Sequence, residues 1–207
     1  MALNGYKRKL RNAGNRKRNP VIFLNAEGKN KTETLYFKDF GKDRNRIVRF
    51  ASGNHTDPVH MVNELQKYME ENDYNEELGD RAFCLVDADT NPEKDKKIAT
   101  ADKMAKKYGI QVIVSAPCFE VWFLCHYVLT SKVFSSNNEV MGEVEKYLPE
   151  YQKDALNMYE KTKNRLSSAK KNAIKLENYF KSCGYIPHTT TFAPSTEVYH
   201  IVDTLLC

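Results

Sequence analysis

The chain has 207 residues, of which 41% are hydrophobic and 29% charged, with a formal net charge of +5. This profile is typical of a soluble globular protein built as one large domain, or as one domain with an appendage. No apolar stretch approaches the roughly 20 residues of a membrane-spanning helix, so we expect neither membrane insertion nor a secretory signal. The five cysteines show no CxxC spacing, which favours reduced thiols in a cytoplasmic protein over a zinc site or a disulfide framework.

Residues 1–18 form a basic segment. They carry a charge of +7 without one acidic residue, so the rest of the chain nets −2 (+5 minus +7). The asparagines and glycines of this segment favour turns over helix. We expect a flexible arm that binds nucleic acid, and the alternative is a solubilising tail that touches nothing. Its basic residues are Lys7, Arg8, Lys9, Arg11, Arg16, Lys17 and Arg18.

Between residues 21 and 114 the pattern alternates between strands and helices. Apolar runs predict strands at 21–25, 47–50, 82–86 and 110–114, and amphipathic stretches predict helices near 31–41, 58–71 and 93–108. Asp57 can cap the second helix, whose first residue is Pro58, and Gly109 ends the third. This order predicts a mainly parallel α/β sheet with helices on both faces.

After residue 115 the pattern becomes mostly helical. It predicts a helix from Cys118 to about Leu129, a polar loop at 135–138, amphipathic helices over about 139–183, and a last short helix at 195–206 capped by Ser195 or Thr196. A stripe at helical spacing predicts packing against the sheet, and it comprises Leu166, Ala169, Ala173, Leu176 and Phe180. A nearby lysine face, Lys163, Lys170 and Lys181, either meets phosphates or is simply solvated.

Acidic residues follow two of the predicted strands. Glu27 comes after the first strand, and Asp87 and Asp89 come after the third. The carboxyl ends of parallel strands line the crevice where open α/β sheets bind ligands, and alternate residues of an extended segment point the same way. Three carboxylates would repel one another unless they shared a cation, and oxygen ligands suit Mg²⁺ or Mn²⁺. The alternatives are a solvent-facing Glu27 and an aspartate-rich turn completed by Asn91-Pro92.

The helix after the fourth strand adds another acidic residue. Glu120 stands in its first turn, near the same edge of the sheet, where it either joins the acidic site or merely complements the helix dipole. We expect Trp122 and His126, which lie in the same apolar helix, to belong to the core. No P-loop, dinucleotide-binding, zinc-protease or nucleophile-elbow motif is present, which leaves the corresponding activities without support.

Four stretches of the chain together resemble the RloB-like family. They are Glu27-Gly28 through Thr32-Glu33 and Tyr36-Phe37, then Val86-Asp87-Ala88-Asp89, then Pro117 through Tyr127, and finally Pro194 through Tyr199. The resemblance implies a Toprim-type fold, the metal-binding α/β domain of topoisomerases, primases and related nucleases. It implies that Glu27 serves as metal ligand or general base and acid, and that Asp87 and Asp89 are metal ligands. It also implies a setting in prokaryotic anti-phage defence, often beside an ATPase of the structural-maintenance type.

We therefore predict a basic arm at 1–18, a Toprim-like α/β core at 20–130, and a helical C-terminal extension at 131–207 packed on the core. The predicted activity is Mg²⁺-dependent (or Mn²⁺-dependent) endonucleolytic cleavage of DNA or RNA. Glu27, Asp87, Asp89 and Glu120 are the predicted catalytic residues, while the arm, Lys163 and Lys170 would bind nucleic acid.

Two other functions stay open at this point. The first is a non-catalytic subunit, with a degenerate Toprim fold, that binds nucleic acid or an ATPase. The second is a small phosphatase or phosphotransfer domain, which Glu27 disfavours because an aspartyl-phosphate enzyme would have aspartate after its first strand.

Overall fold

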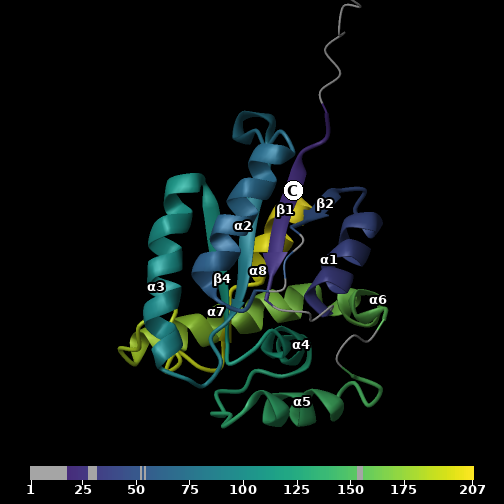
Figure 1. Ribbon diagram of the computed structural model, residues 1–207. Helices are drawn as coiled ribbons and strands as arrows, with labels where there is room; N and C mark the ends of the chain where they lie inside the picture. The colour runs from purple at the N-terminus through teal and green to yellow at the C-terminus, as the bar shows by residue number, and fades with distance from the viewer. Residues whose placement is uncertain (1–17, 28–31, 52, 54, 153–155) are drawn as a thin grey trace, which may run out of the picture.

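The protein is built around a five-stranded sheet covered by helices on both faces (Figure 1). The structure is a computed structural model, and it describes residues 18–27, 32–51, 53, 55–152 and 156–207. The strand order is β2-β1-β3-β4-β5, with β1 Val21–Ala26, β2 Ile47–Phe50, β3 Arg81–Asp87, β4 Ile110–Ala116 and β5 Ser195–Thr196. The first four strands are parallel and β5 is antiparallel to β4. The predicted mainly parallel α/β sheet is confirmed.

Strand residues alternate between two hydrophobic layers. In β1, Ile22 and Leu24 join one buried cluster, whereas Val21 and Phe23 join the other. This period of two is the expected consequence of pleating when both faces of a strand are covered. Each layer therefore fixes the register of the strands, because a slip by one residue would exchange the two sets.

The helices of the first half begin and end where local signals place them. They are α1 Thr32–Asp43, α2 Pro58–Glu71 and α3 Glu93–Ala105, with short 3₁₀ helices at Glu76–Leu78 and Lys106–Tyr108. The Asp57 side chain accepts hydrogen bonds from the backbone N–H groups of Val59 (3.0 Å) and His60 (3.3 Å). Gly109 adopts a φ of +68°, the left-handed conformation that ends a helix at low cost. In Figure 1, α2 and α3 lie together on one side of the sheet.

The helices of the second half build the opposite layer. They are α4 Glu120–Tyr127, α5 Asn137–Glu145, α6 Met158–Thr162, α7 Leu166–Ser182 and α8 Tyr199–Leu206, with a 3₁₀ turn at Lys163–Arg165. The predicted apolar stripe of α7 is buried, but α7 lies mainly against α4 and also contacts β5 and α8. Its packing against the sheet is therefore largely indirect.

Three boundaries in this half were predicted wrongly. The helix after Pro117 ends at Tyr127 rather than Leu129, because Val128 is extended. Helix α5 begins at Asn137, inside the predicted loop, because the Ser136 hydroxyl caps it by accepting from the backbone N–H of Glu139.

The third error concerns residues 195–196. Ser195 and Thr196 do not cap a helix but form strand β5, paired with Ala116 and Ser115. The hydroxyl groups of Ser115 and Thr196 lie 2.8 Å apart, which ties the two strands together through their side chains. The last helix, α8, begins only at Tyr199.

The C-terminal residues share a core with the first strands. Ile201 and Leu205 of α8 lie in the same buried cluster as Ile22 of β1. Cys84, Cys118 and Cys125 are buried, as predicted for Cys84 and Cys125. Among the helices that the structure describes, none combines the length and apolar composition that a membrane crossing requires.

Candidate acidic site at the carboxyl edge of the sheet

Acidic side chains from four segments meet at the carboxyl edge of the sheet, near the lower end of β1 in Figure 1. Glu27 follows β1, Asp87 is the last residue of β3, and Asp89 lies two residues further on. Glu120 opens α4 just after β4, and Glu33 is the second residue of α1. Because β1, β3 and β4 are parallel, their carboxyl ends bring these side chains together, as the sequence predicted.

Glu27 is tied to both β3 and α3. Its Oε2 atom accepts a hydrogen bond from the backbone N–H of Asp87 at 3.1 Å, and its two oxygens lie 2.7 and 2.8 Å from Nζ of Lys94. Burial raises the pKa of Glu27, and the charge and hydrogen bond of Lys94 oppose that shift without cancelling it. Glu27 therefore points into the protein and is not the solvent-facing loop residue of the alternative interpretation.

Lys94 was not predicted from the sequence. Its Nζ atom also lies 2.7 Å from Oδ2 of Asp89, so the ammonium group bridges two of the predicted metal ligands. Burial alone would lower the pKa of Lys94, but Glu27 and Asp89 outweigh burial and raise it, which keeps the amine protonated. A lysine in the first turn of α3 opposes the helix dipole, and that unfavourable placement was the available sequence signal.

Asp89 lies in the loop that follows β3 and not in an extended segment. Its φ is +55°, its backbone N–H donates to the carbonyl oxygen of Pro117 at 2.8 Å, and Nδ2 of Asn137 donates to its Oδ1 at 3.2 Å. The argument that Asp87 and Asp89 point the same way along a strand is therefore wrong. Lys94 and Asn137 hold the Asp89 carboxylate beside Glu27 instead.

Asp87 lies at the centre of the negative charge. Removal from water raises its pKa well above the usual range, and the charges of its acidic neighbours raise it further. In decreasing order of effect these neighbours are Glu33, Glu27, Glu120 and Asp89. The site therefore concentrates more negative charge around Asp87 than an isolated aspartate-rich turn would carry.

Glu120 is buried, with 4% of its surface exposed, and it accepts a hydrogen bond from the Tyr151 hydroxyl at 2.7 Å. Burial and the Glu120 charge both raise the pKa of Tyr151, so the phenol stays protonated and remains a donor. A buried, hydrogen-bonded carboxylate does more than complement a helix dipole from the surface. Tyr151 comes from the segment between α5 and α6, and nothing in its sequence context indicated this contact.

The carboxylate oxygens of this site are suitable ligands for a hard divalent cation, but the structure has the ammonium group of Lys94 between two of the carboxylates. All the acidic ligands offer carboxylate oxygens, the kind that Mg²⁺ and Mn²⁺ prefer. Within the described part of the chain, no group of three or more histidines, cysteines, aspartates or glutamates is arranged to hold a metal ion. The Lys94 ammonium lies between Glu27 and Asp89, where the sequence predicted the shared cation. A metal held by Glu27, Asp87 and Asp89 would have to displace it.

An open cleft leads to these residues. It has a volume of about 240 Å³, and its lining includes Glu27, Asp89, Asn91, Lys94 and Lys97. Both acidic and basic groups face this space, so a phosphate could approach Lys94 and Lys97 while a cation approached the carboxylates.

None of the predicted nucleic-acid-binding residues that the structure describes lines this cleft, and each of them pairs with an acidic residue. Lys163 pairs with Asp43 (3.6 Å) and Glu160 (2.7 Å), and Lys170 pairs with Asp203 (2.7 Å). Six of the seven basic residues of the arm, and Gly28, lie outside the described residues. The seventh, Arg18, pairs with buried Asp80 at the opposite edge of the sheet, so it belongs to the fold.

Trp122 and His126 belong to the core, as predicted. The indole Nε1 of Trp122 donates to the Tyr36 hydroxyl at 3.0 Å, and Nδ1 of His126 lies 2.8 Å from the Trp122 carbonyl oxygen. Burial lowers the pKa of His126 to about 4, so its ring is neutral near pH 7. Neither side chain serves the acidic site.

Fold and site together define an α/β protein whose parallel sheet carries a crowded carboxylate site bridged by one lysine. A family model described as "RloB-like protein" matches residues 22–205. The chain belongs to this RloB-like family, as its four sequence stretches indicated.

Two further comparisons add little. A de novo designed Rossmann-fold protein is similar in structure, with a TM-score of 0.34 and 13% sequence identity over 64% of this chain and 99% of the designed chain. At that TM-score the similarity carries no argument about either fold or function. No curated protein sequence matches the chain.

Proposed function

We propose that the protein is a metal-dependent nuclease of Toprim type that cleaves nucleic-acid phosphodiester bonds with Mg²⁺ or Mn²⁺. The observation that carries the proposal is the convergence of Glu27, Asp87 and Asp89 at one edge of a parallel sheet. Glu33 and Glu120 add to the charge around Asp87. Carboxylates crowded in this way bind a divalent cation favourably because the cation relieves their mutual repulsion.

The chain's own residues then have distinct tasks. Glu27, Asp87 and Asp89 would hold the cation, which would offset charge on the scissile phosphate and activate water. Glu27, whose Oε2 accepts from the backbone N–H of Asp87, would serve as metal ligand or as general base and acid, as the resemblance implies. Lys94, once displaced from the carboxylates, would donate to a phosphate oxygen at the mouth of the cleft.

The biological setting is part of the same proposal. A role in prokaryotic anti-phage defence, beside an ATPase of the structural-maintenance type, is what the resemblance to the RloB-like family implies. Nucleic acid would be held mainly by the basic arm, while Lys97, which lines the cleft, also pairs with Asp57 at 3.0 Å and would contribute less.

A non-catalytic subunit is the second candidate, and one observation favours it. Lys94 gives Glu27 and Asp89 an internal counterion, so the site is partly neutralised without metal. A protein that had lost turnover could keep such a pair for stability.

The proposal is tested with the purified full chain and labelled plasmid DNA, single-stranded DNA and tRNA. We expect cleavage of at least one substrate with Mg²⁺ or Mn²⁺, and none with EDTA. Asp102→Asn, which changes an aspartate on the outer part of α3, is the matched control for variants of the site and should cleave like the parent. Binding without cleavage under every metal condition would favour the non-catalytic subunit.

A further inference from the structure

A second groove adjoins the acidic cleft and shares Asp89 with it. Its volume is about 430 Å³, within the range of ligand-binding sites in proteins. Its lining includes Phe134, from the loop before α5, Phe180, near the end of α7, and Tyr185, which follows α7. Pro117, whose carbonyl oxygen accepts from the Asp89 backbone, also lines it. A ligand that lies in this groove would therefore extend directly from the acidic site.

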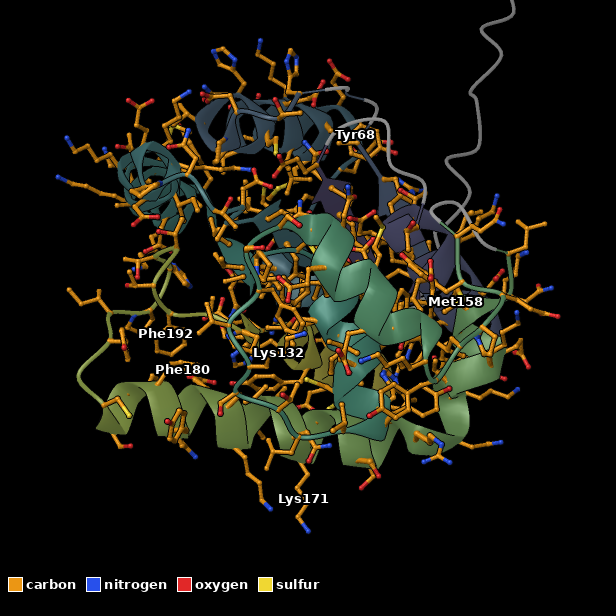
Figure 2. All side chains as sticks on the ribbon, turned by 90° about the horizontal axis from the view of Figure 1, so that it is seen from below. Tyr68, Lys132, Met158, Lys171, Phe180 and Phe192 are labelled. Atoms are coloured by element: carbon orange, nitrogen blue, oxygen red, sulfur yellow. The ribbon has the colours of Figure 1, made fainter. Side chains whose placement is uncertain are left out.

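Tyr185 presents aromatic surface to the groove, while Phe134 and Phe180 of the same lining are buried, with 4% and 5% of their surface exposed. The Phe180 ring packs edge-on against Tyr185, with centroids 5.6 Å apart, and lies 5.7 Å from the Phe192 ring. These contacts hold the rings in place, yet Tyr185 stays 45% exposed. Val133, another lining residue, is 73% exposed. Figure 2 shows Phe180, Phe192 and Lys132 on the inner side of α7, while Lys171 points the other way.

The polar part of the lining is preformed. Thr190 is anchored to α3, because its backbone N–H and its hydroxyl donate to Asp95 at 2.9 and 3.4 Å. The Thr191 hydroxyl lies 3.0 Å from that of Thr189. Hydroxyl groups fixed at the rim can hydrogen-bond the edge of a polar planar ligand without reorganising the loop.

The charge of the groove selects the part of a ligand that can enter. Asp89 is the one charged side chain among the described residues that line it. Two ammonium groups border the groove, but both already have acidic partners: Lys94 pairs with Asp89 and Glu27, and Lys132, whose Nζ lies 5.1 Å from the centroid of the Phe134 ring, pairs with Glu139 and Glu143. A phosphate in the groove would also face the Asp89 carboxylate, whereas a neutral ring could stack on Tyr185. The groove therefore suits a base better than a backbone.

We propose that this groove binds one unpaired nucleobase of the strand whose phosphate lies at the acidic site. The inference rests on the nuclease function proposed for that neighbouring site. A base stacked inside a duplex is enclosed by its neighbours, so the substrate would be single-stranded or would have that base extruded.

The probes are single strands of 12 nucleotides, as DNA and as RNA, each with one abasic position moved stepwise along the strand. Binding is measured by fluorescence anisotropy with Ca²⁺ in place of Mg²⁺. The test variants are Tyr185→Ala and Val133→Glu, both at exposed wall positions. The control is Tyr108→Ala, a tyrosine of similar exposure (40%) outside the groove.

We expect one abasic position to weaken binding to the parent by about tenfold, a typical effect of losing one base–aromatic stack. Tyr185→Ala should weaken binding of the intact strand to a similar extent, with little further loss on that abasic strand, because the two changes remove the same interaction. Val133→Glu should also weaken binding, and Tyr108→Ala should bind like the parent. Comparison of the DNA strands with the RNA strands shows which of the two nucleic acids supplies the bound base.

The inference is overturned if no abasic position matters, if Tyr185→Ala binds like the parent, or if a blunt duplex binds as well as the single strand. If the same strands were nevertheless cleaved with Mg²⁺, the proposed nuclease function would remain supported and only the base-binding site would be rejected. Conversely, base-dependent binding without cleavage would support the base site and count against the nuclease.

Discussion

Carboxylates lie at the amino edge of the sheet, where the parallel strands begin, and at its carboxyl edge, where they end. Their surroundings shift the carboxylate pKa values in opposite directions. At the amino edge, buried Asp80 accepts hydrogen bonds from the backbone N–H groups of Val21 (2.8 Å) and Asn75 (2.9 Å) and from the Arg18 guanidinium (2.9 Å). Burial alone would raise the pKa of Asp80, but these donors outweigh it and lower the pKa. At the carboxyl edge, burial and neighbouring acids raise the pKa of Asp87.

The difference separates a carboxylate that supports the fold from carboxylates arranged for a ligand. Asp80 has a cation and two backbone donors of its own, so it needs nothing from outside the chain. Asp87 faces several acids, and the Lys94 ammonium bonds to Glu27 and Asp89. Carboxylates with strongly shifted pKa values beside a cleft, here the one lined by Glu27 and Asp89, are typical of functional sites, which is why we propose a function for the second edge and not for the first.

The largest expected effect is on cleavage. Asp87→Asn and Glu27→Gln should each lower the rate by about a hundredfold or more, because each removes a ligand from the proposed cation. Far-ultraviolet circular dichroism should match the parent, since the substitutions are close in shape. Parent-like rates in both variants would contradict the metal assignment.

A smaller loss of turnover is expected at Glu120. Glu120→Gln should reduce cleavage by about tenfold to a hundredfold, the usual cost of disturbing a group next to a metal site. Tyr151→Phe, which removes only the hydrogen bond to Glu120, should have a weaker effect. Thermal melts accompany the rates, and a Glu120→Gln variant with both melt and rate like the parent would make Glu120 purely structural.

Stability should distinguish the two edges by sign. Asp80→Asn should lower the free energy of unfolding by about 1–3 kcal/mol, because it weakens or removes the partners of buried donors. Asp87→Asn should instead stabilise the metal-free protein at pH 7, because it removes a carboxylate from among other carboxylates. Denaturant titrations of both variants in EDTA give the comparison, and a loss of stability of similar size in both would remove the distinction.

The pH dependence follows from the same pKa shifts. Asp80 has a lowered pKa, so its contribution is present above the unfolded value near 3.9 and is lost as pH falls through the folded value. Asp87 has a raised pKa, so metal-free stability should fall as pH rises from about 3.9 through the folded value. Asp87→Asn should flatten that fall, although Glu27, whose raised pKa acts in the same direction, would leave part of it. Unfolding free energies at several pH values test this.

The smallest expected effect concerns the salt dependence of nucleic-acid binding. Deletion of residues 1–17 retains the Arg18–Asp80 pair and should flatten the log–log slope on duplex DNA by about 0.9 for each phosphate that the arm neutralises. Lys163→Ala and Lys170→Ala should change the slope less, because each lysine already has an acidic partner. If truncation leaves the slope unchanged, the arm is only a tail.

Local signals account for what the sequence predicted correctly. Short apolar runs located the four parallel strands, and Asp57-Pro58 placed the start of α2. The convergence of Glu27 and Asp87 followed from the parallel order, since it needs no knowledge of side-chain contacts.

The rest depends on contacts between distant residues. Strand β5 has only two residues, and it forms because it pairs with β4, which lies about 80 residues earlier in the chain. The partnership of Tyr151 with Glu120, and that of Lys94 with Glu27, likewise join separate segments. The left-handed conformation of Asp89 arises at the loop that follows β3, where the strand period no longer applies.

The central claim is that a divalent cation binds at the carboxyl edge in place of Lys94. The most direct measurement is the melting temperature of the parent, Lys94→Met and Asp87→Asn over a titration of Mg²⁺ and Mn²⁺. We predict that metal raises the melting temperature of the parent. Lys94→Met should show the same rise at a metal concentration at least about fivefold lower, because the competing ammonium group is gone. Asp87→Asn should respond weakly or not at all. A parent that melts at the same temperature with and without metal, or an Asp87→Asn variant that responds like the parent, would contradict the claim.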